Sequence, residues 1–407
     1  MGIVVQKFGG TSVADVEKIK NVARKAIREK ERGNDVVVVV SAMGKTTDQL
    51  QDMAHQITDE PPPREMDMLM STGEQVSIAM LAIAIHSLGS KAISFTGPQV
   101  GIITDTAHRK ARIKSINSEK IKRALKEGNI VIVAGFQGCT MDQDITTLGR
   151  GGSDTTAVAL AAALDALECD IYTDVDGVYT TDPRIVPGAR KLDRISYDEM
   201  LELASLGARV LHNRSVELAK NYNVVIHVRS SFEDKPGTLV VKEDDSMEDI
   251  VVSGVAYNLS ESKISIVGVP DKPGMASEIF SRIADSQIVV DMIIQNVGED
   301  GKNDISFTVS KDDFKQTLKI AEELCRELEA DEVRSDEKIA KVSVVGVGMK
   351  AHCGVAAKMF KSLARAGVNI EMISTSEIKI SCVIREDDLE KAVQAIHNEL
   401  QLEEPPV

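Results

Sequence analysis

The chain has 407 residues, which is long enough for two or three domains with a large hydrophobic core. Its 63 acidic and 48 basic residues give a net charge of −15, which argues against a nucleic-acid or anionic-membrane partner. Five scattered cysteines without a Cys-x-x-Cys pair offer no zinc ligand set and fit a reducing, cytoplasmic environment. We expect no secretory signal, and the longest apolar stretch, residues 78–85, is too short to span a bilayer.

Residues 1–230 alternate between strand-like and helix-like segments. Short apolar runs predict buried strands at residues 3–5, 36–40, 130–134 and 170–173. Longer periodic or apolar segments predict helices at residues 13–30, 71–88, 118–127 and 155–167. This alternation predicts an α/β domain built on a mostly parallel central sheet.

Residues 7–12, with the sequence KFGGTS, lie where the first strand turns into the first helix. Glycines let backbone N–H groups approach an anion closely, and a helix N-terminus adds partial positive charge. Because Lys7 adds a full positive charge, the stretch predicts a phosphate-binding turn. An ordinary turn, with Ser12 and Asp15 in a capping box, is the alternative.

Residues 149–154, with the sequence GRGGSD, repeat this pattern. The Arg150 guanidinium between glycines suits bidentate binding of a carboxylate or phosphate. A plain loop, with Ser153 or Asp154 as the N-cap of the next helix, is the alternative. The Gly-Lys-Thr at residues 44–46 is no P-loop, because Val39 stands where that motif requires glycine.

Residues 173–184 follow a predicted strand and carry three carboxylates, Tyr179 and Arg184. An EF-hand is excluded, because the twelfth position of either possible loop is Ile185 or Pro187 instead of glutamate. The run is either a turn-rich loop, since Asp-Gly and Asp-Pro favour turns, or a nucleotide-binding loop. The nucleotide-binding loop is the favoured interpretation.

The last 160 residues contain an internal repeat, in which residues 264–293 match residues 342–373. Each copy reads strand, helix, strand, strand, helix. The second copy ends in Pro405-Pro406, which cannot form a central strand. We therefore expect the strand at residues 250–257 to complete the second copy's sheet.

Five ordered motifs together resemble the signature set of the aspartate kinase family, at residues 7–12, 41–44, 149–154, 173–184 and 206–212. The tandem repeat resembles the paired ACT regulatory domains of the same family, so the resemblance covers nearly the whole chain. It implies an amino-acid-kinase catalytic domain at residues 1–245 and a first α+β, ferredoxin-like ACT domain at residues 263–336. A second ACT domain would comprise residues 250–262 and 337–407.

The resemblance implies ATP-dependent phosphorylation of the L-aspartate side-chain carboxylate to 4-phospho-L-aspartate. Mg²⁺ would enter with ATP, with no permanent all-protein metal site, and the product would lead to lysine, threonine and methionine. A carboxylate acceptor is already ionised at pH 7, so the reaction needs no general base. This agrees with a sequence in which no Ser/His/Asp arrangement is evident.

The resemblance also implies residue roles, with Lys7 stabilising the transferred phosphoryl group and Asp154 orienting Lys7. The residues implied to hold aspartate are Ser41, Thr47, Glu74, Arg150 and Ser153. Those implied to hold ATP are Lys7, Gly9, Gly10, Thr173, Asp174, Tyr179, Arg184 and Arg209. Glu74 would select a free α-ammonium, since an N-acetylated substrate leaves that charge unpaired. Arg209 stands where the family commonly has lysine.

ACT pairs of this family bind an amino acid where two units join into one sheet. We expect inhibition by lysine, threonine or both, and an effector site made by Asp271, Met275, Ala276, Gln295, Asn296, Asn369 and Ile370. Simple strand-end polarity is the alternative for Asn296 and Asn369. Cys353 stands where proline is frequent, in the loop before the second ACT helix.

Because ACT sheet edges need cover, we also expect a homo-oligomer. Met247 is a candidate internal start for a separate, shorter regulatory subunit. Two rival functions remain: a kinase of the same fold acting on glutamate or N-acetylglutamate, and a non-catalytic amino-acid sensor.

Overall fold

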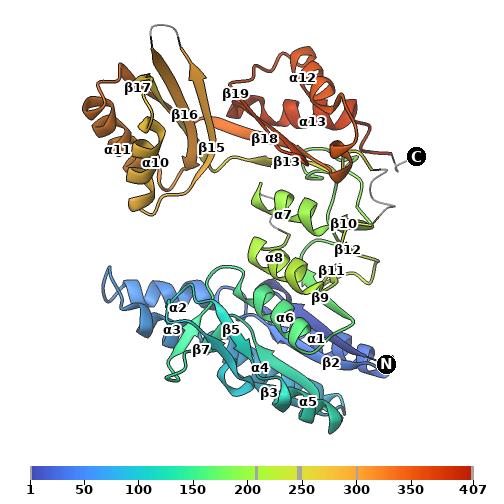
Figure 1. The fold of residues 1–407 in the computed structure, drawn as a ribbon. Coiled ribbons are helices and arrows are strands. Elements are labelled where there is room, and N and C mark those ends of the chain that lie inside the picture. Colours follow the sequence, from blue (N-terminus) through green and yellow to red (C-terminus); the bar gives the residue numbers. More distant parts are fainter. Residues whose placement is uncertain (1, 207–209, 245–249, 299–300, 405–407) are drawn as a thin grey trace. The chain divides into compact units, whose positions relative to one another are not determined.

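The computed structural model describes residues 2–206, 210–244, 250–298 and 301–404. These residues form two compact units (Figure 1). The first unit comprises the described residues up to Val178, Lys191–Ser205, and the described residues from 210 to 244. The second comprises Tyr179–Arg190, Leu206 and the described residues from 250 to 404.

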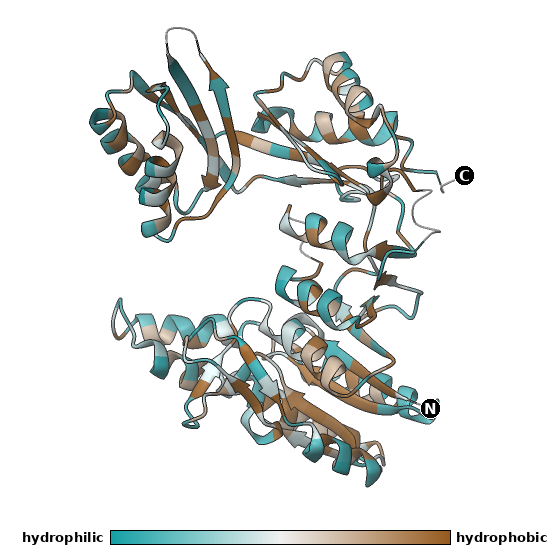
Figure 2. Cartoon of the chain, in the orientation of Figure 1, coloured by the Kyte–Doolittle hydropathy of each residue, from teal (hydrophilic) through white to brown (hydrophobic). Residues whose placement is uncertain are grey.

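The first unit is built on an eight-stranded sheet in the order β10-β12-β11-β9-β1-β2-β6-β3. Its strands are β1 (Ile3–Phe8), β2 (Asp35–Val40), β3 (Ala92–Phe95), β6 (Ile130–Ala134), β9 (Glu168–Thr173), β10 (Arg194–Ser196), β11 (Ile226–Ser230) and β12 (Thr238–Val241). All neighbours pair in parallel except β11 and β12. The mostly parallel sheet predicted from the sequence is therefore confirmed. Figure 2 shows hydrophobic residues concentrated in its central strands.

A smaller four-stranded sheet in the same unit has the order β5-β4-β7-β8. Its strands are β4 (Ile102–Thr104), β5 (Ile113–Ile116), β7 (Gln137–Cys139) and β8 (Ile145–Thr147). The helices of the unit are η1 (Gly10–Val13), α1 (Val16–Glu31), α2 (Thr46–His55), α3 (Pro63–Met70), α4 (Thr72–Ser87), η2 (Pro98–Val100), α5 (Glu119–Lys126), α6 (Gly152–Ala163), α7 (Tyr197–Ser205) and α8 (Asn213–Tyr222). Helices α1 and α4 cover one face of the large sheet, where their apolar side chains pack with Phe8 and the valines of β2.

Several helix boundaries differ from the sequence prediction, and two of them have a clear local cause. Helix α1 begins at Val16 because the Asp15 carboxylate caps it, accepting a hydrogen bond from the Lys18 N–H at 2.9 Å. Helix α6 ends at Ala163, four residues before the predicted end. Asp165 adopts a left-handed conformation, with φ of 50°, and the Leu167 N–H then donates to the Ile3 carbonyl.

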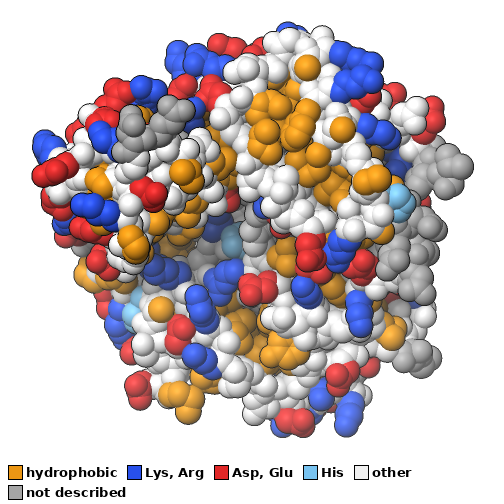
Figure 3. Space-filling model, turned by 45° about the horizontal axis from the view of Figure 1, so that its top comes forward, with side chains coloured by type: hydrophobic (Ala, Val, Ile, Leu, Met, Phe, Trp, Pro, Cys, Tyr) orange, Lys and Arg blue, Asp and Glu red, His pale blue; other side chains and the backbone are white. Residues whose placement is uncertain are grey.

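Helices α3 and α4 follow each other so closely that residues Pro63–Ser87 form one stretch long and apolar enough to cross a membrane. The sequence prediction considered only residues 78–85 and missed this length. Within the first unit, α4 packs against α1, β3 and β6, as the core helix of a folded domain does. On the face drawn in Figure 3, acidic and basic side chains are interspersed.

The second unit contains two four-stranded antiparallel sheets, each with two long helices. The first sheet has the order β15-β16-β14-β17, from β14 (Glu261–Pro270), β15 (Val290–Val297), β16 (Lys302–Ser310) and β17 (Glu332–Asp336), with helices α10 (Met275–Asp285) and α11 (Phe314–Glu327). The second has the order β13-β18-β20-β19, from β13 (Gly254–Asn258), β18 (Ile339–Val345), β19 (Met372–Thr375) and β20 (Lys379–Arg385), with helices η3 (Val347–Lys350), α12 (Val355–Arg365), η4 (Glu386–Asp388) and α13 (Leu389–Glu399). Strand β13 pairs antiparallel with β18, so the segment before the first repeat lies in the sheet of the second.

Residues 179–190, which the sequence prediction assigned to the catalytic region, pack in the second unit. The Thr180 carbonyl accepts a hydrogen bond from the Val255 N–H at 2.7 Å, and the Thr180 hydroxyl pairs with the His397 ring at 2.9 Å. The Tyr257 hydroxyl donates to Asp182 at 2.9 Å, and Val186 joins the core of the second repeat. A stretch of sequence between two strands of the large sheet is thus anchored in the C-terminal repeat.

Candidate active site

The carboxyl ends of β1, β2 and β6 bring three loops together in the first unit. The Ser41 N–H, just after β2, donates to the Phe8 carbonyl at the end of β1 at 3.1 Å. The Gly135 N–H, just after β6, donates to the Val40 carbonyl at 3.0 Å. Ligands of open α/β sheets collect at this edge, so the side chains that follow these strands are the candidates for chemistry.

Lys7 and Asp154 form an ion pair at this edge. Lys7 is near the end of β1, and Asp154 lies in the first turn of α6. The Lys7 Nζ lies 2.6 Å from the Asp154 Oδ1, and each side chain is 12 % exposed. The structure therefore brings together the lysine and the carboxylate that the two glycine-rich motifs predicted, and it leaves them partly open to a ligand.

The turn at Gly9 and Gly10 is packed tightly against the loop after β2. A Cβ atom on Gly10 would lie 3.0 Å from the Ala42 carbonyl oxygen and 3.1 Å from that of Gly44. The Gly44 N–H donates to the Gly10 carbonyl at 3.0 Å. Glycine is favoured here by this close approach of two backbones, because a side chain would push the neighbouring loop away by a few tenths of an ångström.

The turn at residues 149–154 depends on backbone conformation. Gly149 and Gly151 have φ of 76° and 70°, which favours glycine. A Cβ atom on Gly151 would lie 2.2 Å from the His212 Cγ, so this imidazole packs directly on the turn. The Arg150 side chain is exposed. Ser153 lies next to Gly135, where an added Cβ atom would be 2.8 Å from the Ser153 Oγ.

Two residues that the sequence analysis missed support this second turn. The Asp67 side chain is buried in α3, where it accepts hydrogen bonds from the Thr147 hydroxyl at 2.5 Å and from the Arg109 N–H at 3.0 Å, and pairs with the His108 Nδ1 at 2.7 Å. A Cβ atom on Gly149 would lie 2.8 Å from the Arg109 carbonyl oxygen, so the segment held by Asp67 underlies the turn.

Arg214, at the start of α8, is the other support. Its Nη1 donates to the Leu148 carbonyl at 2.5 Å and its Nη2 to the Ala111 carbonyl at 3.0 Å. Burial, and to a smaller extent the nearby Arg112, lowers the pKa of Arg214. No local sequence motif indicates these roles, because Asp67 is 80 residues from Thr147 and Arg214 is 66 residues from Leu148.

Glu74 is a buried carboxylate at the start of α4. Its Oε1 accepts a hydrogen bond from the Ala42 N–H at 3.1 Å, while its Oε2 is buried and has no hydrogen-bond partner in the described part of the chain. Burial raises the pKa of Glu74 to about 8. A carboxylate in this state gains most from a cationic ligand, which would supply the missing partner. Ser41 and Thr47, which are half-buried, lie just after β2 and in the first turn of α2.

The residues predicted to bind ATP are divided between the two units. Thr173 ends β9 in the first unit, and its hydroxyl donates to the Asp174 carboxylate at 3.0 Å. Tyr179 and Arg184 belong to the second unit. The Arg184 guanidinium lies 2.7 Å from an Asp182 oxygen and is 87 % exposed, and it holds the pKa of Asp182 down to about 2. Arg209 lies outside the described residues, as does Met247.

The predicted effector residues all lie in the second unit. Asp271, just after β14, accepts a hydrogen bond from the Asn303 side chain at 2.9 Å. Met275 and Ala276 begin α10, Gln295 and Asn296 are exposed on β15, and Asn369 and Ile370 precede β19. Strand β15 is an edge strand of its sheet, as β19 is of the other.

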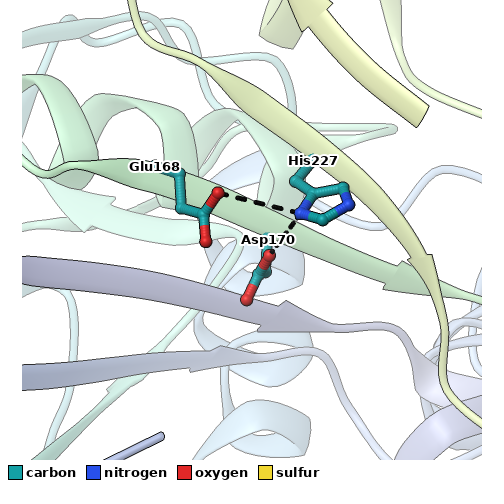
Figure 4. A group of neighbouring side chains, drawn as sticks. All are labelled: Glu168, Asp170 and His227. Atoms are coloured by element: carbon teal, nitrogen blue, oxygen red, sulfur yellow. Dashed lines mark ion pairs between the residues drawn. The ribbon is translucent and has the colours of Figure 1, made fainter. Parts of the chain in front are cut away.

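Figure 4 shows Glu168, Asp170 and His227, which come from the neighbouring strands β9 and β11. The His227 Nδ1 lies 3.4 Å from the Asp170 Oδ1 and 3.7 Å from the Glu168 Oε2. Burial alone would lower the pKa of His227, but the adjacent carboxylates of Asp170 and Glu168 raise it to about 9. With Arg229 3.7 Å from Asp170, two cations balance two carboxylates, which indicates an ion-pair cluster between strands.

Comparison with known proteins gives three family matches. Residues 2–230 match the amino acid kinase family, and residues 264–329 and 342–400 each match an ACT domain. The chain is 55 % identical over 406 residues to an aspartate kinase of Pseudomonas putida, covering 100 % of this chain and 99 % of that protein. It is 54 % identical to an aspartokinase of Mycolicibacterium smegmatis, covering 98 % and 96 %.

Two solved structures extend the comparison to three dimensions. The structure of E. coli aspartokinase III in complex with aspartate and ADP has a TM-score of 0.81 at 27 % identity, over 98 % of this chain and 100 % of that one. The structure of an aspartate kinase from Synechocystis has a TM-score of 0.56 at 49 % identity, over 98 % and 69 %.

Proposed function

This chain belongs to the aspartate kinase family, with an amino acid kinase region followed by two ACT domains, and we propose that its Lys7–Asp154 pair is the centre of phosphoryl transfer. It uses ATP to phosphorylate the side-chain carboxylate of L-aspartate, and amino acids regulate it through its ACT domains. The family match covers the full length of the chain. The residue roles that follow are part of the proposal.

The observation that carries the proposal is the meeting of two glycine-rich turns at one ion pair. Phosphoryl transfer needs alignment and neutralisation of the phosphate charge more than covalent help. The Lys7 ammonium would stabilise the transferred phosphoryl group, flanked by the N–H groups of Gly9 and Gly10. Asp154, 2.6 Å away, would hold the lysine in position. Because the aspartate carboxylate is already ionised, no proton has to be removed first.

Glu74 would recognise the substrate's α-ammonium group. Its Oε2 is buried and has no hydrogen-bond partner in the described residues, so a bound ammonium would satisfy it. Arg150, Ser153, Ser41 and Thr47 would hold the two carboxylates of aspartate, with Arg150 as the cationic contact. An N-acetylated substrate would leave Glu74 without its cation, and a glutamate side chain would be one methylene longer.

The nucleotide would enter as Mg–ATP, with Mg²⁺ as part of the substrate. Thr173 and Asp174, at the end of β9, would contact it in the first unit. Tyr179, Arg184 and Arg209 are further proposed contacts. Residues 179–190 pack in the unit that contains the ACT domains, so Tyr179 and Arg184 belong to that unit.

Lysine, threonine or both together would be the effectors, at a site formed by Asp271, Met275, Ala276, Gln295, Asn296, Asn369 and Ile370. The exposed edge strand β15 favours assembly into a homo-oligomer, because an unpaired edge exposes free backbone N–H and C=O groups. We further propose a catalytic domain at residues 1–245, except for residues 179–190, which pack in the second unit. The proposed ACT domains comprise residues 263–336, and residues 250–262 with 337–407. The proposal also includes a cytoplasmic enzyme and Met247 as the start of a shorter regulatory chain.

Initial-rate kinetics with an ADP readout test this function. We expect turnover with L-aspartate and Mg–ATP, and little with L-glutamate or N-acetyl-L-glutamate. Millimolar lysine plus threonine should lower the rate. Turnover with N-acetylglutamate at the rate seen with aspartate would contradict the role of Glu74. Insensitivity to both amino acids, alone and together, would contradict the proposed effectors. ADP formation at background level with all three substrates would favour the amino-acid sensor instead.

A further inference from the structure

A cavity of about 590 Å³ lies in the first unit between β5, α6 and α8. Its size is in the range of sites that bind small organic molecules. Neither Lys7 nor Asp154 lines it, and neither do the residues proposed to hold aspartate. The function proposed above therefore makes no use of it.

Three cations converge on this cavity in a chain whose net charge is −15. They are Lys110 and Arg112, from the segment leading into β5, and Arg214, from the start of α8. Neither Lys110 nor Arg112 forms an ion pair with a carboxylate among the described residues, and the acidic residue in the lining is Glu217. Burial and then the nearby Arg112 lower the pKa of Arg214, while the carboxylates of Asp105 and Glu217 raise it, so two acidic groups already offset part of the positive charge at this end of the cavity.

The rest of the wall combines apolar side chains with the uncharged polar groups of Ser115, Thr155, Asn221 and Tyr222. Helix α6 contributes Ala159, Ala162 and Ala163, which recur at the spacing of one helix face, and β5 contributes Ile113 and Ile116. Small alanine side chains leave the volume open, and the isoleucines offer an apolar contact. The cavity thus combines a cationic part with an apolar part, which suits a ligand that carries an anionic group on an apolar body.

Arg214 connects the cavity to the turn at residues 149–154. The same guanidinium that lines the cavity donates hydrogen bonds to the carbonyls of Leu148 and Ala111. Leu148 immediately precedes Gly149. An anion bound beside Arg214 would compete with these carbonyls for the guanidinium N–H groups, because charge-assisted hydrogen bonds are stronger than neutral ones.

We propose that this cavity binds a small organic anion, a carboxylate, sulfonate or phosphate on an apolar body, and that its occupancy acts on the 149–154 turn through Arg214. The binding step is independent of the proposed function, and only the effect on turnover depends on it. The site lies in the kinase unit, so it would be a second regulatory input that does not use the ACT domains.

A matched pair of fluorescent probes tests the binding step. The probe 8-anilinonaphthalene-1-sulfonate carries an anion on an aromatic body, and N-phenyl-1-naphthylamine is the same body without the sulfonate. We expect the full-length protein to bind one equivalent of the sulfonate. The double variant Lys110→Gln/Arg112→Gln should weaken that affinity at least about tenfold, and leave the neutral probe unchanged.

The control variant Lys114→Gln/Arg123→Gln removes the same two charge types from exposed positions on β5 and α5 that do not line the cavity. It should bind the sulfonate as the wild type does. Ala162→Phe, which fills the apolar part, should abolish binding without changing any charge. Circular dichroism and the melting temperature check that each variant is folded. Equal sulfonate affinity in the wild type and both double variants would overturn the site.

The coupling step needs a kinetic readout. Saturating sulfonate probe should change kcat in the wild type and in the control variant, and leave the cavity variant unchanged. If the sulfonate probe binds one to one and kcat does not change, the proposed effect of the cavity on turnover through Arg214 is wrong, while the proposed binding site is supported. Binding is measured without ATP or aspartate, and also in Lys7→Ala. A failure of the proposed catalytic centre is therefore distinguishable from a failure of this inference.

Discussion

The two glycine-rich turns that meet at Lys7 and Asp154 are supported in different ways. The Gly9–Gly10 turn is held by backbone contacts with the loop after β2, where the Gly44 N–H donates to the Gly10 carbonyl at 3.0 Å. The 149–154 turn has backbone hydrogen bonds too, such as Gly152 N–H to the Gly149 carbonyl at 3.0 Å. In addition, the Asp67 side chain holds the segment beneath it, and the Arg214 guanidinium donates to the Leu148 carbonyl. We infer that the conformation of the first turn tolerates side-chain changes around it. The conformation of the second turn depends on a few residues that are distant in sequence.

The largest effect is expected where the two turns meet. Replacing Lys7 by alanine removes the ammonium that would neutralise the transferred phosphate, so we expect kcat to fall about 10³-fold. The control is Lys20→Ala, since Lys20 is an exposed lysine of α1 whose partner is Glu17. Near-normal turnover of Lys7→Ala, in a protein that melts like the wild type, would remove the central mechanistic claim.

A smaller effect is expected at Glu74, whose Oε1 accepts from the Ala42 N–H beside the first turn. Glu74→Gln removes the charge that would bind the α-ammonium, so we expect KM for aspartate to rise about 10²-fold, with a smaller change in kcat. Glu17→Gln, at an exposed position of α1, is the control. An unchanged KM in the Gln variant would exclude Glu74 from substrate binding.

The same residue makes a prediction about pH. Burial raises the pKa of Glu74 to about 8, so without substrate it is largely protonated at pH 7. We expect KM for aspartate to fall as pH rises towards 8, because ionised Glu74 binds the ammonium. The sign for stability is opposite: the unfolded state ionises near pH 4.5, so this group destabilises the fold as pH rises from there to about 8. Glu74→Gln should flatten both dependences, which pH-resolved kinetics and melting curves would measure.

Replacing Asp67 tests whether the second turn depends on side-chain support. Asp67→Ala leaves the Thr147 hydroxyl and the Arg109 N–H without their buried acceptor, so we expect a loss of about 3 kcal/mol in the free energy of unfolding. Asp67→Asn keeps an acceptor oxygen and the shape, and should restore most of that stability. We expect kcat/KM for aspartate about tenfold below wild type in the Asn variant, since the turn beneath Arg150 would be less well fixed.

Denaturant unfolding and initial rates separate the two parts of that prediction. Ser310→Ala, which removes a hydroxyl that pairs with Asp313 in the second unit, is a control for a lost hydrogen bond away from the turn. If Asp67→Asn regains full stability and also full activity, Asp67 only stabilises the fold and does not position the turn.

Much of the kinase region could be predicted because its signals are local in sequence. The valines of β2 and the apolar run of β6 predict buried parallel strands, and both strands are confirmed. Each glycine-rich stretch alone predicts an anion-binding turn, and the family resemblance implies that Asp154 orients Lys7. Their 2.6 Å contact follows from the fold, in which both turns lie at the same edge of one sheet.

The supports of the second turn could not be predicted, because each acts over a long sequence separation. In the sequence, Asp67 looks like an ordinary polar residue of a short helix. Only the fold brings it within hydrogen-bond distance of the Arg109 N–H and the Thr147 hydroxyl. The anchoring of residues 179–190 was missed for the same reason, since the contact of Thr180 with His397 joins segments 217 residues apart. The roles of the residues proposed to bind aspartate, ATP and effector stay predictions.

The smallest effect is expected at the first turn. The Ser12 and Ser231 hydroxyls pair at 2.5 Å, and both residues are buried. Ser12→Ala leaves the Ser231 hydroxyl without this partner and should cost about 1 kcal/mol in unfolding free energy. The double variant Ser12→Ala/Ser231→Ala should recover most of that loss, because no buried hydroxyl is then left unpaired. We expect kcat within about twofold of wild type in both, since backbone contacts hold the turn. A tenfold loss of kcat in Ser12→Ala would show that the first turn also depends on side-chain support, and the contrast between the turns would then disappear.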